Sequence, residues 1–283
     1  MPTDPEEFRA AARERWEASA AGWSRARTWF QRDASPVSRR LVELVEPEPG
    51  RTVLELAAGT GDTGFLALAD LEPGGKLITT DGAEGMVAAA RARAEELDVT
   101  ELVEARTMEA EWLDLPTASV DGVLCRWGYM LLADPETALR ETRRVLRPGG
   151  RLALACWDTP ETNPWNMGKL LVRLGFAEPS DPDEPGPFSL ADPAAIRELL
   201  ESVGFVDDLT VEAVDFTFHA PSADAWWDQQ RDLSHSLGEV AARLSPAEHT
   251  RLRDAVDEAL AAYVHQDGSL AIPARTLVAG ATA

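Results

Sequence analysis

Cysteine is nearly absent from this sequence, and no long apolar segment occurs in it. The only two cysteines among 283 residues, Cys125 and Cys156, lie inside apolar segments, which argues for two reduced core thiols rather than a secreted, disulfide-linked protein. No window approaches the roughly 18 consecutive apolar residues of a membrane-spanning helix. Residues 1–15 are charged and lack the apolar stretch of a signal peptide. We therefore expect a cytoplasmic protein.

Basic residues are scarce relative to acidic ones. Lys and Arg total 27 against 49 for Asp and Glu, which gives a formal net charge of −22. A field of this sign repels phosphate backbones and anionic membranes, so we expect neither nucleic acid nor a membrane as a partner. No cluster of His, Cys and carboxylates has metal-ligand spacing, so no metal is expected. The oligomeric state stays open.

Short apolar segments alternate with helical patterns through the middle of the chain. Strands are expected at residues 51–56, 76–80, 102–107, 120–125 and 151–157. This alternation is typical of βαβ units, and it predicts an α/β fold with a mainly parallel sheet covered on both faces. Further strands at 205–218 and 269–279 complete a doubly wound, Rossmann-like sheet of seven strands.

Helical and irregular segments surround this predicted core. The N-terminal region has the pattern of two helices, 5–30 and 36–45, the second beginning at Pro36. The predicted division of the chain is a helical cap at 1–46, a ligand-binding core at 47–157, an inserted loop and helix at 158–191, a core helix and strand at 192–219, a helical lid at 220–266 and the last core strand at 267–283.

A glycine-rich turn after the first strand is the strongest signal for a ligand site. Residues 53–64 read VLELAAGTGDTG, a strand that ends in the acid Glu55 and runs into glycines that let the backbone approach a ligand before a helix begins. Three of these glycines also satisfy the G-x-G-x-x-G pattern of dinucleotide-binding proteins, and Asp81 lies at a suitable distance for a ribose-binding acid. The turn alone is therefore also compatible with a nicotinamide or flavin oxidoreductase.

Further motifs follow the later strands in order. Glu-Ala at 109–110 follows the third strand, Ser-Val-Asp at 119–121 leads into the fourth, and ALRE at 138–141 with RVLRPGGRL at 144–152 precedes the fifth. Glu55 offers a carboxylate to a cationic amino-acid tail rather than to a pyrophosphate. This combination resembles the class I S-adenosylmethionine (SAM) dependent methyltransferases, in particular those of ubiquinone and menaquinone biosynthesis.

The resemblance covers residues 51–157 closely, and it implies a set of cofactor contacts. The turn around the methionine part of SAM would comprise Glu55, Ala57, Gly59, Thr60 and Gly61. The contacts to ribose and adenine would come from Asp81, Gly82, Met86, Glu109 and Ala110. Among these, the carboxylate of Asp81 would take the ribose hydroxyls, and that of Glu109 would accept from the adenine amino group. Arg126 would line the methionine end, where the methyl group is delivered.

Three residues depart from the pattern of this family. Ala57 replaces the usual first glycine, and Glu109 stands where Asp is commoner. Arg126 places a cation near the sulfonium, where it would pair with the cofactor's carboxylate or with Glu55, or serve a structural ion pair. Asp81 has an alternative role too, as the N-cap of the following helix.

Nine tryptophans, several of them at strand ends or in the insertions, favour an apolar or aromatic small-molecule acceptor. We expect Trp23, Trp127 and Trp226 to wall its site, under a lid formed by the N-terminal helix and the segment around Trp226. The alternative is that these indoles form the core of a helical subdomain. If the acceptor must lose a proton, His235 or Tyr129 is the expected base.

The sequence therefore predicts a SAM-dependent methyltransferase that moves a methyl group to an oxygen, nitrogen or carbon atom of a small molecule. Two other functions stay open. One is a Rossmann-type NAD(P)-dependent oxidoreductase that shares the glycine pattern, and the other is a SAM-binding protein without transfer activity.

Overall fold

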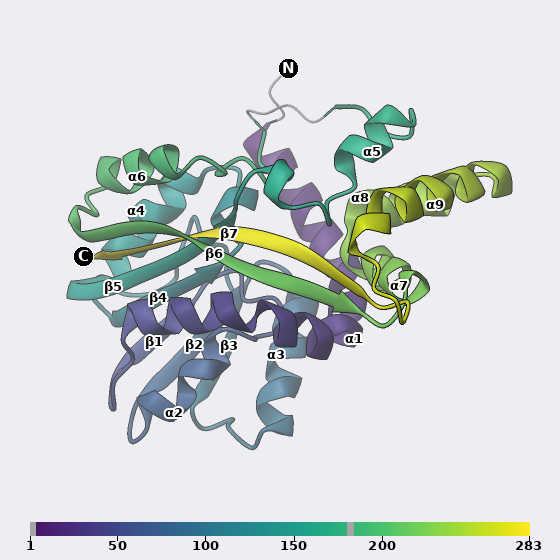
Figure 1. Ribbon diagram of the computed structural model, residues 1–283. Helices are drawn as coiled ribbons and strands as arrows, with labels where there is room; N and C mark the ends of the chain where they lie inside the picture. The colour runs from purple at the N-terminus through teal and green to yellow at the C-terminus, as the bar shows by residue number, and fades with distance from the viewer. Residues whose placement is uncertain (1–3, 180–183) are drawn as a thin grey trace.

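The computed structural model describes residues 4–179 and 184–283, apart from the side chains of residues 235 and 236. A seven-stranded sheet runs through it, with helices on both faces (Figure 1). The strands are β1 (Thr52–Glu55), β2 (Lys76–Asp81), β3 (Val103–Thr107), β4 (Val120–Arg126), β5 (Leu146–Trp157), β6 (Asp207–Ala220) and β7 (Leu270–Thr282). Their order in the sheet is β3-β2-β1-β4-β5-β7-β6.

Strand β7 alone runs against the other strands of the sheet. The pairs among β1 to β5 are parallel, whereas β7 pairs antiparallel with both β5 and β6, so β6 points the same way as β5. The chain order reverses between β1 and β4, which is the kind of switch point where open α/β sheets bind ligands at the carboxyl ends of their strands. The predicted doubly wound, mainly parallel sheet of seven strands is confirmed.

Helices cover the two faces of the sheet, with α4 and α6 on one side and α2 and α3 on the other (Figure 1). Their bounds are α2 (Leu68–Leu71), α3 (Glu84–Glu96), α4 (Pro135–Val145) and α6 (Pro193–Ser202). Local sequence explains where α4 and α6 begin. The carboxylates of Asp134 and Asp192 accept hydrogen bonds from the backbone N–H groups of Thr137 and Ala194, and a proline follows each cap.

A single helix, α1 (Pro5–Val45), replaces the two helices predicted at 5–30 and 36–45. Pro36 lies inside this helix and removes one backbone donor, which is why the sequence pattern favoured a break there. Packing of α1 against the core offsets the lost hydrogen bond at Pro36. Apolar side chains recur on the buried face of the helix: Phe30, Ala34, Val37 and Leu41. None of the helices in the described ranges is long and apolar enough to cross a membrane.

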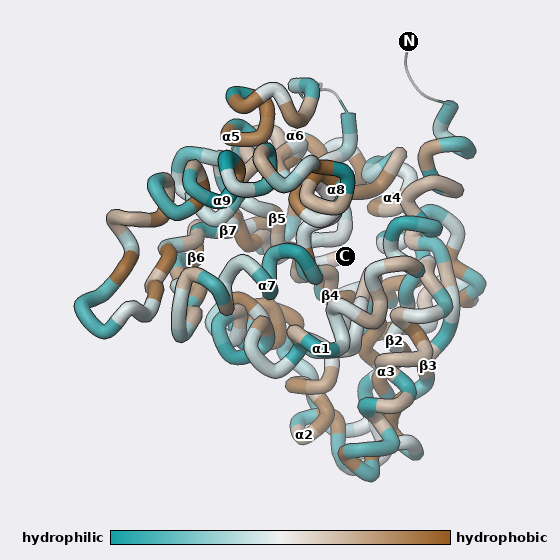
Figure 2. The backbone as a smooth tube through the Cα atoms, turned by 90° about the vertical axis from the view of Figure 1, so that its right-hand side faces the viewer, coloured by the Kyte–Doolittle hydropathy of each residue, from teal (hydrophilic) through white to brown (hydrophobic). Residues whose placement is uncertain are grey.

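The segment predicted as a helical lid contains three α-helices and a short 3-10 helix (Ala261–Tyr263). The three α-helices lie beyond the end of the sheet with the short helix α5 (Figures 1 and 2). Their bounds are α5 (Gly168–Arg173), α7 (Ala223–Leu233), α8 (His235–Arg243) and α9 (Pro246–Leu260). A serine caps each of the last three helices. The hydroxyls of Ser222, Ser234 and Ser245 accept hydrogen bonds from backbone N–H groups in the following turn.

Helix α7 packs directly on α1, and a glycine makes this close approach possible. A Cβ atom on Gly22 would lie 2.5 Å from the carbonyl oxygen of Asp232. Beside this contact, Arg25 donates two hydrogen bonds to the Asp232 carboxylate, at 2.7 and 3.2 Å. The N-terminal helix is therefore packed and hydrogen-bonded to the first helix of the insertion.

Gly22→Ala should destabilise the protein although alanine is the better helix former. At an exposed helical position the change would gain about 1 kcal/mol, but here the added methyl group meets a backbone oxygen. We expect a net loss of about 1–3 kcal/mol in the free energy of unfolding, measured with urea. Ala18→Gly, at an exposed position of the same helix, is the control and should cost about 1 kcal/mol from propensity alone. A stabilised Gly22→Ala variant would contradict the α1–α7 contact.

Candidate active site

A buried carboxylate holds the glycine-rich turn after β1. Glu55 is 2% exposed, and its two oxygens accept hydrogen bonds from the backbone N–H of Gly64 at 2.8 Å and from the hydroxyl of Thr79 at 3.0 Å. A Cβ atom on Gly64 would lie 2.6 Å from the carboxylate, so glycine is required there. Burial raises the pKa of Glu55 to about 7, against the opposing effect of these hydrogen bonds. Glu55 therefore supports the turn from within the core.

The turn itself contains strained backbone. Gly59 and Gly61 have positive φ angles of 57° and 80°, which glycine adopts freely. Ala57 has a φ of 48°, which costs a residue with a Cβ roughly 1–2 kcal/mol, and Trp127 after β4 has a φ of 60°. The two residues lie close together. Gly128 directly follows Trp127, and a Cβ atom on Gly128 would lie 2.6 Å from the Cβ of Ala57. Strain of this kind clusters at ligand sites, and here it lies at the switch point of the sheet.

Asp81, the last residue of β2, joins the turn to helix α3. Its carboxylate accepts hydrogen bonds from the backbone N–H of Gly59 at 2.9 Å and from that of Ala83 at 3.0 Å. Burial raises the pKa of Asp81 to about 6, and the nearby Glu109 carboxylate adds to the rise, while the two backbone donors oppose it. Asp81 is not the N-cap of α3, which is Ala83; its carboxylate instead accepts from the N–H of that cap residue and from the turn.

The third carboxylate of the site, Glu109, lies beside Gly82 and is bound by the N-terminal helix. A Cβ on Gly82 would be 3.0 Å from the Glu109 carboxylate, and Arg13 of α1 donates to the same carboxylate at 2.8 Å. Met86 and Ala110 are 1% and 7% exposed. The structure thus brings the residues predicted along ribose and adenine together at one edge of the sheet.

Helix α1 crosses this edge and is attached to it by charged contacts. Arg9 donates to both oxygens of the buried Glu111, at 2.9 and 3.1 Å, and Glu17 accepts from the backbone N–H of Gly85 at 2.8 Å. Glu111 also accepts from the backbone N–H of Asp134, ahead of α4. Sequence reasoning missed Arg9, Glu17 and Glu111; the only available signal was that Glu111 directly follows the motif at 109–110.

Arg126 lies where β4 ends, and of the alternatives expected for it the structure shows an ion pair, with Asp62. Its guanidinium donates to the hydroxyl of Ser38 at 2.6 Å and lies 3.6 Å from the carboxylate of Asp62, rather than forming a hydrogen bond to Glu55. The ring of Trp127 is 4.9 Å from the guanidinium carbon. Burial lowers the pKa of Arg126, and the Asp62 and Glu55 carboxylates oppose this. Sequence reasoning also missed Ser38 and Asp62.

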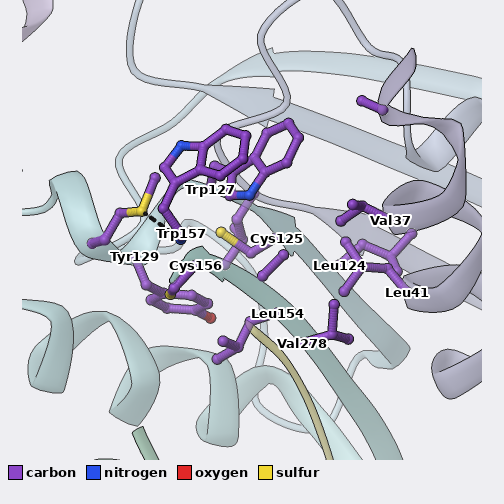
Figure 3. Packing of buried hydrophobic residues seen from close by; sticks show 14 of the residues in the cluster. Val37, Leu41, Leu124, Cys125, Trp127, Tyr129, Leu154, Cys156, Trp157 and Val278 are labelled. Carbon is purple, nitrogen blue, oxygen red and sulfur yellow. Dashed lines mark hydrogen bonds between the residues drawn. The ribbon is translucent and has the colours of Figure 1, made fainter. Parts of the chain in front are cut away.

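Aromatic rings continue from Arg126 along the carboxyl ends of β4 and β5. The indoles of Trp127 and Trp157 stack at 4.2 Å with 10° between their planes, as Figure 3 shows. Phe30 contacts both Trp127 and Trp23, at centroid distances of 5.6 and 5.0 Å. Two of the predicted walls, Trp23 and Trp127, thus belong to one aromatic array. Trp226 is 1% exposed within α7, and its indole N–H has no hydrogen-bond partner among the described residues.

Of the two predicted bases, the structure describes the side chain of Tyr129 alone. The hydroxyl of Tyr129 is hydrogen-bonded to that of Thr142 at 2.6 Å, and it points away from the two stacked indoles (Figure 3). Burial raises the pKa of Tyr129 well above its usual range, which favours a packing role over proton abstraction. The side chain of His235 lies outside the described residues. His219, at the end of β6, contacts Asp33 at 3.2 Å and ties α1 to the sheet.

Comparisons with known proteins decide between the two classes that the glycine turn allows. A family model described as a methyltransferase domain matches residues 54–154. Nocamycin O-methyltransferase from Saccharothrix syringae is 30% identical over 201 residues, which are 67% of this chain and 71% of that protein. The chain belongs to the SAM-dependent methyltransferases. The G-x-G-x-x-G match is therefore incidental, and the oxidoreductase interpretation is set aside.

Other relatives agree over the core of this methyltransferase. A ubiquinone/menaquinone biosynthesis C-methyltransferase from Acidiphilium cryptum is 41% identical over 113 residues, or 40% of this chain and 45% of that protein. The chain thus spans about half the length of that relative. The structure of a putative methyltransferase from Bacillus halodurans shares the fold, with a TM-score of 0.56 and 19% identity over 87% of this chain and 97% of that one. Across the described ranges of the methyltransferase, no group of three His, Cys, Asp or Glu residues could hold a metal ion.

Glu55→Gln should change the pH dependence of stability. Because burial raises the pKa of Glu55 from 4.5 to about 7, the folded protein keeps its proton more tightly than the unfolded chain, and ionisation costs stability as pH rises through 7. Glutamine stays neutral. The stability of the variant relative to the wild type should therefore rise by about 2 kcal/mol between pH 5 and pH 8, in urea unfolding. Exposed Glu14→Gln is the control, and an equally flat profile for both variants would contradict the burial effect.

Proposed function

We propose that this protein transfers the methyl group of SAM to a small apolar or aromatic acceptor. The observation that carries the proposal is the position of Asp81. It ends β2, the strand beside β1, is held by backbone groups on both sides, and lies near Glu109 at the carboxyl ends of the strands. Two carboxylates at this edge suit the ribose hydroxyls and the adenine amino group of an adenosyl cofactor.

The proposed contacts follow the order of the cofactor. Asp81 binds the ribose, while Gly82, Met86, Glu109 and Ala110 surround the adenine. The backbone of the turn, at Ala57, Gly59, Thr60 and Gly61, lies along the methionine part, with Glu55 supporting the turn and Arg126 at the far end. When bound, SAM supplies a methyl group on a sulfonium, ready for in-line displacement. The task of the protein is then to align acceptor and methyl group and to exclude water.

The acceptor site is proposed at the aromatic array beyond Arg126. Trp23, Trp127 and Trp226 form its walls, and Trp157, stacked on Trp127, extends it. Flat apolar surfaces of this kind suit planar or polyketide-like molecules. The names of two relatives, a quinone-biosynthesis C-methyltransferase and an O-methyltransferase of nocamycin, support such a substrate class and leave the acceptor atom open. His235 stays a proposed base for acceptors that must lose a proton.

Asp81→Asn should weaken the binding of S-adenosylhomocysteine (SAH) at least tenfold without unfolding the protein. The neutral amide loses a charge-assisted acceptor for the ribose hydroxyls, each worth about 1.5–3 kcal/mol. Isothermal titration calorimetry measures the affinity, and NAD should produce no binding heat. Asp70→Asn, on the exposed face of α2, is the matched control. Unchanged SAH affinity in a folded Asp81→Asn variant would refute the ribose contact, and tight NAD binding would refute the proposed function.

Trp226→Phe should weaken acceptor binding and leave SAH affinity nearly unchanged. Phenylalanine keeps a ring in this buried position but removes the indole N–H and part of the wall. With a panel of naphthoquinols and phenols as acceptors, the KM of any methylated compound should rise several-fold. Trp112→Phe, on an exposed indole, is the control. If SAH affinity and acceptor KM change together, or neither changes, Trp226 belongs to the core of the lid and not to the acceptor site.

A further inference from the structure

Buried polar atoms without a partner gather where helix α7 packs on α1. Among the described residues, five buried side-chain nitrogen or oxygen atoms have no hydrogen-bond partner. Three of the five belong to these two helices: the indole nitrogen of Trp23 on α1, the indole nitrogen of Trp226 on α7 and the side-chain oxygen of Gln229 on α7. Buried polar atoms in folded proteins are almost always hydrogen-bonded, so such a cluster needs a functional explanation.

The three side chains lie around one helix contact. Trp23 directly follows Gly22, the residue of α1 that meets the backbone of Asp232 on α7. On α7, Gln229 lies about one helical turn before Asp232, and Trp226 lies about one turn before Gln229. Residues at this spacing are neighbours on one side of a helix, so Trp226 and Gln229 present an unpaired donor and an unpaired acceptor together.

Other tryptophans of this protein show how a buried indole is satisfied when the chain itself supplies an acceptor. Trp127 donates to the hydroxyl of Thr276 at 2.8 Å, and Trp165 donates to the side-chain oxygen of Asn163 at 2.9 Å. The unpaired indoles on α1 and α7 have no such neighbour among the described residues. Their N–H groups are therefore free to bind a ligand.

Trp23 connects this cluster to both proposed binding sites. Its ring packs against the buried cluster that contains Met86, a proposed adenine contact, and lies 5.0 Å from the ring of Phe30. Phe30 in turn contacts Trp127, and the guanidinium carbon of Arg126 is 5.5 Å from the Phe30 ring. The unpaired atoms thus border the region where the methyl group of SAM would meet its acceptor.

The kinds of atom left unpaired indicate the chemistry of their ligand. An indole N–H can only donate a hydrogen bond, and an amide oxygen can only accept one. Two donors require hydroxyl or carbonyl oxygens on the ligand, and they disfavour an ammonium group, which has no lone pair to offer. The single acceptor requires a ligand hydrogen. A neutral molecule that carries a hydroxyl group beside a second oxygen satisfies all three atoms.

We propose that Trp23, Trp226 and Gln229 bind the oxygen atoms of the methyl acceptor, which is a ring compound with two neighbouring oxygens, at least one of them in a hydroxyl group. The two indoles donate to these oxygens, and the side-chain oxygen of Gln229 accepts from the hydroxyl group. This inference rests on the proposed function and extends it, because the lid then selects the acceptor by hydrogen bonds as well as by shape. Unpaired buried atoms cost stability, and binding of the acceptor offsets that cost.

Three naphthalenes test these hydrogen bonds in calorimetric titrations of the protein saturated with SAH. Naphthalene-2,3-diol carries two neighbouring hydroxyl groups, 2-naphthol carries one, and 2-methylnaphthalene carries none. The wild type should bind the diol about tenfold more tightly than 2-methylnaphthalene. Gln229→Met and Trp23→Phe should each weaken the diol by about fivefold or more, and should change the affinity for 2-methylnaphthalene much less.

Gln229→Met also has an expected effect in the absence of any ligand. It replaces a buried unpaired oxygen with an apolar side chain of similar length and helix propensity, so the midpoint of thermal unfolding should rise by about 2–4 °C. Gln266→Met, at an exposed position, is the matched control and should leave the midpoint and the three affinities unchanged. A residue that serves packing alone would not combine a more stable protein with weaker binding of the diol.

The outcomes that overturn the inference are distinct from those that overturn the proposed function. If the SAH complex binds the three naphthalenes equally or binds none of them, or if the variants weaken all three alike or none, the unpaired atoms do not bind the acceptor and the inference fails. A midpoint for Gln229→Met that stays or falls would show that the oxygen is satisfied within the protein, and would also overturn it. Failure of the wild type to bind SAH would refute the proposed function instead.

Discussion

The hydrogen bonds of one buried residue, Glu55, hold together the edge of the sheet where we propose that the cofactor binds. Glu55 accepts from the turn at Gly64 and from Thr79 of β2, and its backbone carbonyl accepts from the Thr80 hydroxyl at 2.8 Å. These bonds link β1, β2 and the start of the next helix within a few ångströms. The turn can therefore keep its left-handed residues, which would otherwise relax. The positions of Asp81 and Asp62 follow from the same constraint.

Only a few basic side chains pair with the carboxylates at this edge of the sheet. In a chain of net charge −22, three of the 27 basic side chains, Arg9, Arg13 and Arg126, pair with carboxylates that lie at the site. Arg9 and Arg13 belong to α1, so the ion pairs that neutralise Glu111 and Glu109 also attach the helix to this edge of the sheet.

Aromatic packing extends the site away from the cofactor. The rings of Trp23, Phe30, Trp127 and Trp157 form a continuous series from α1 to the ends of β4 and β5. Phe30, Trp127 and Trp157 are buried, and neighbouring rings restrict one another, so this array is tightly packed. The proposed acceptor site thus draws on the insertions and on α1, while the proposed cofactor site draws on the sheet.

The sheet and its glycine turn could be predicted from sequence because their signals are local. Apolar segments of strand length, Asp134 and Asp192 before prolines, and glycines after Glu55 each specify nearby backbone. The continuity of α1 through Pro36 could not be predicted from sequence, because the burial of its apolar side chains in the core outweighs one lost backbone hydrogen bond. The contacts of Arg126 with Ser38 and Asp62, and of Arg13 with Glu109, join residues 64 to 96 positions apart. Sequence by itself determined the family of the core, whereas tertiary structure decided which charges meet, because a long side chain pairs with whatever packing brings within reach.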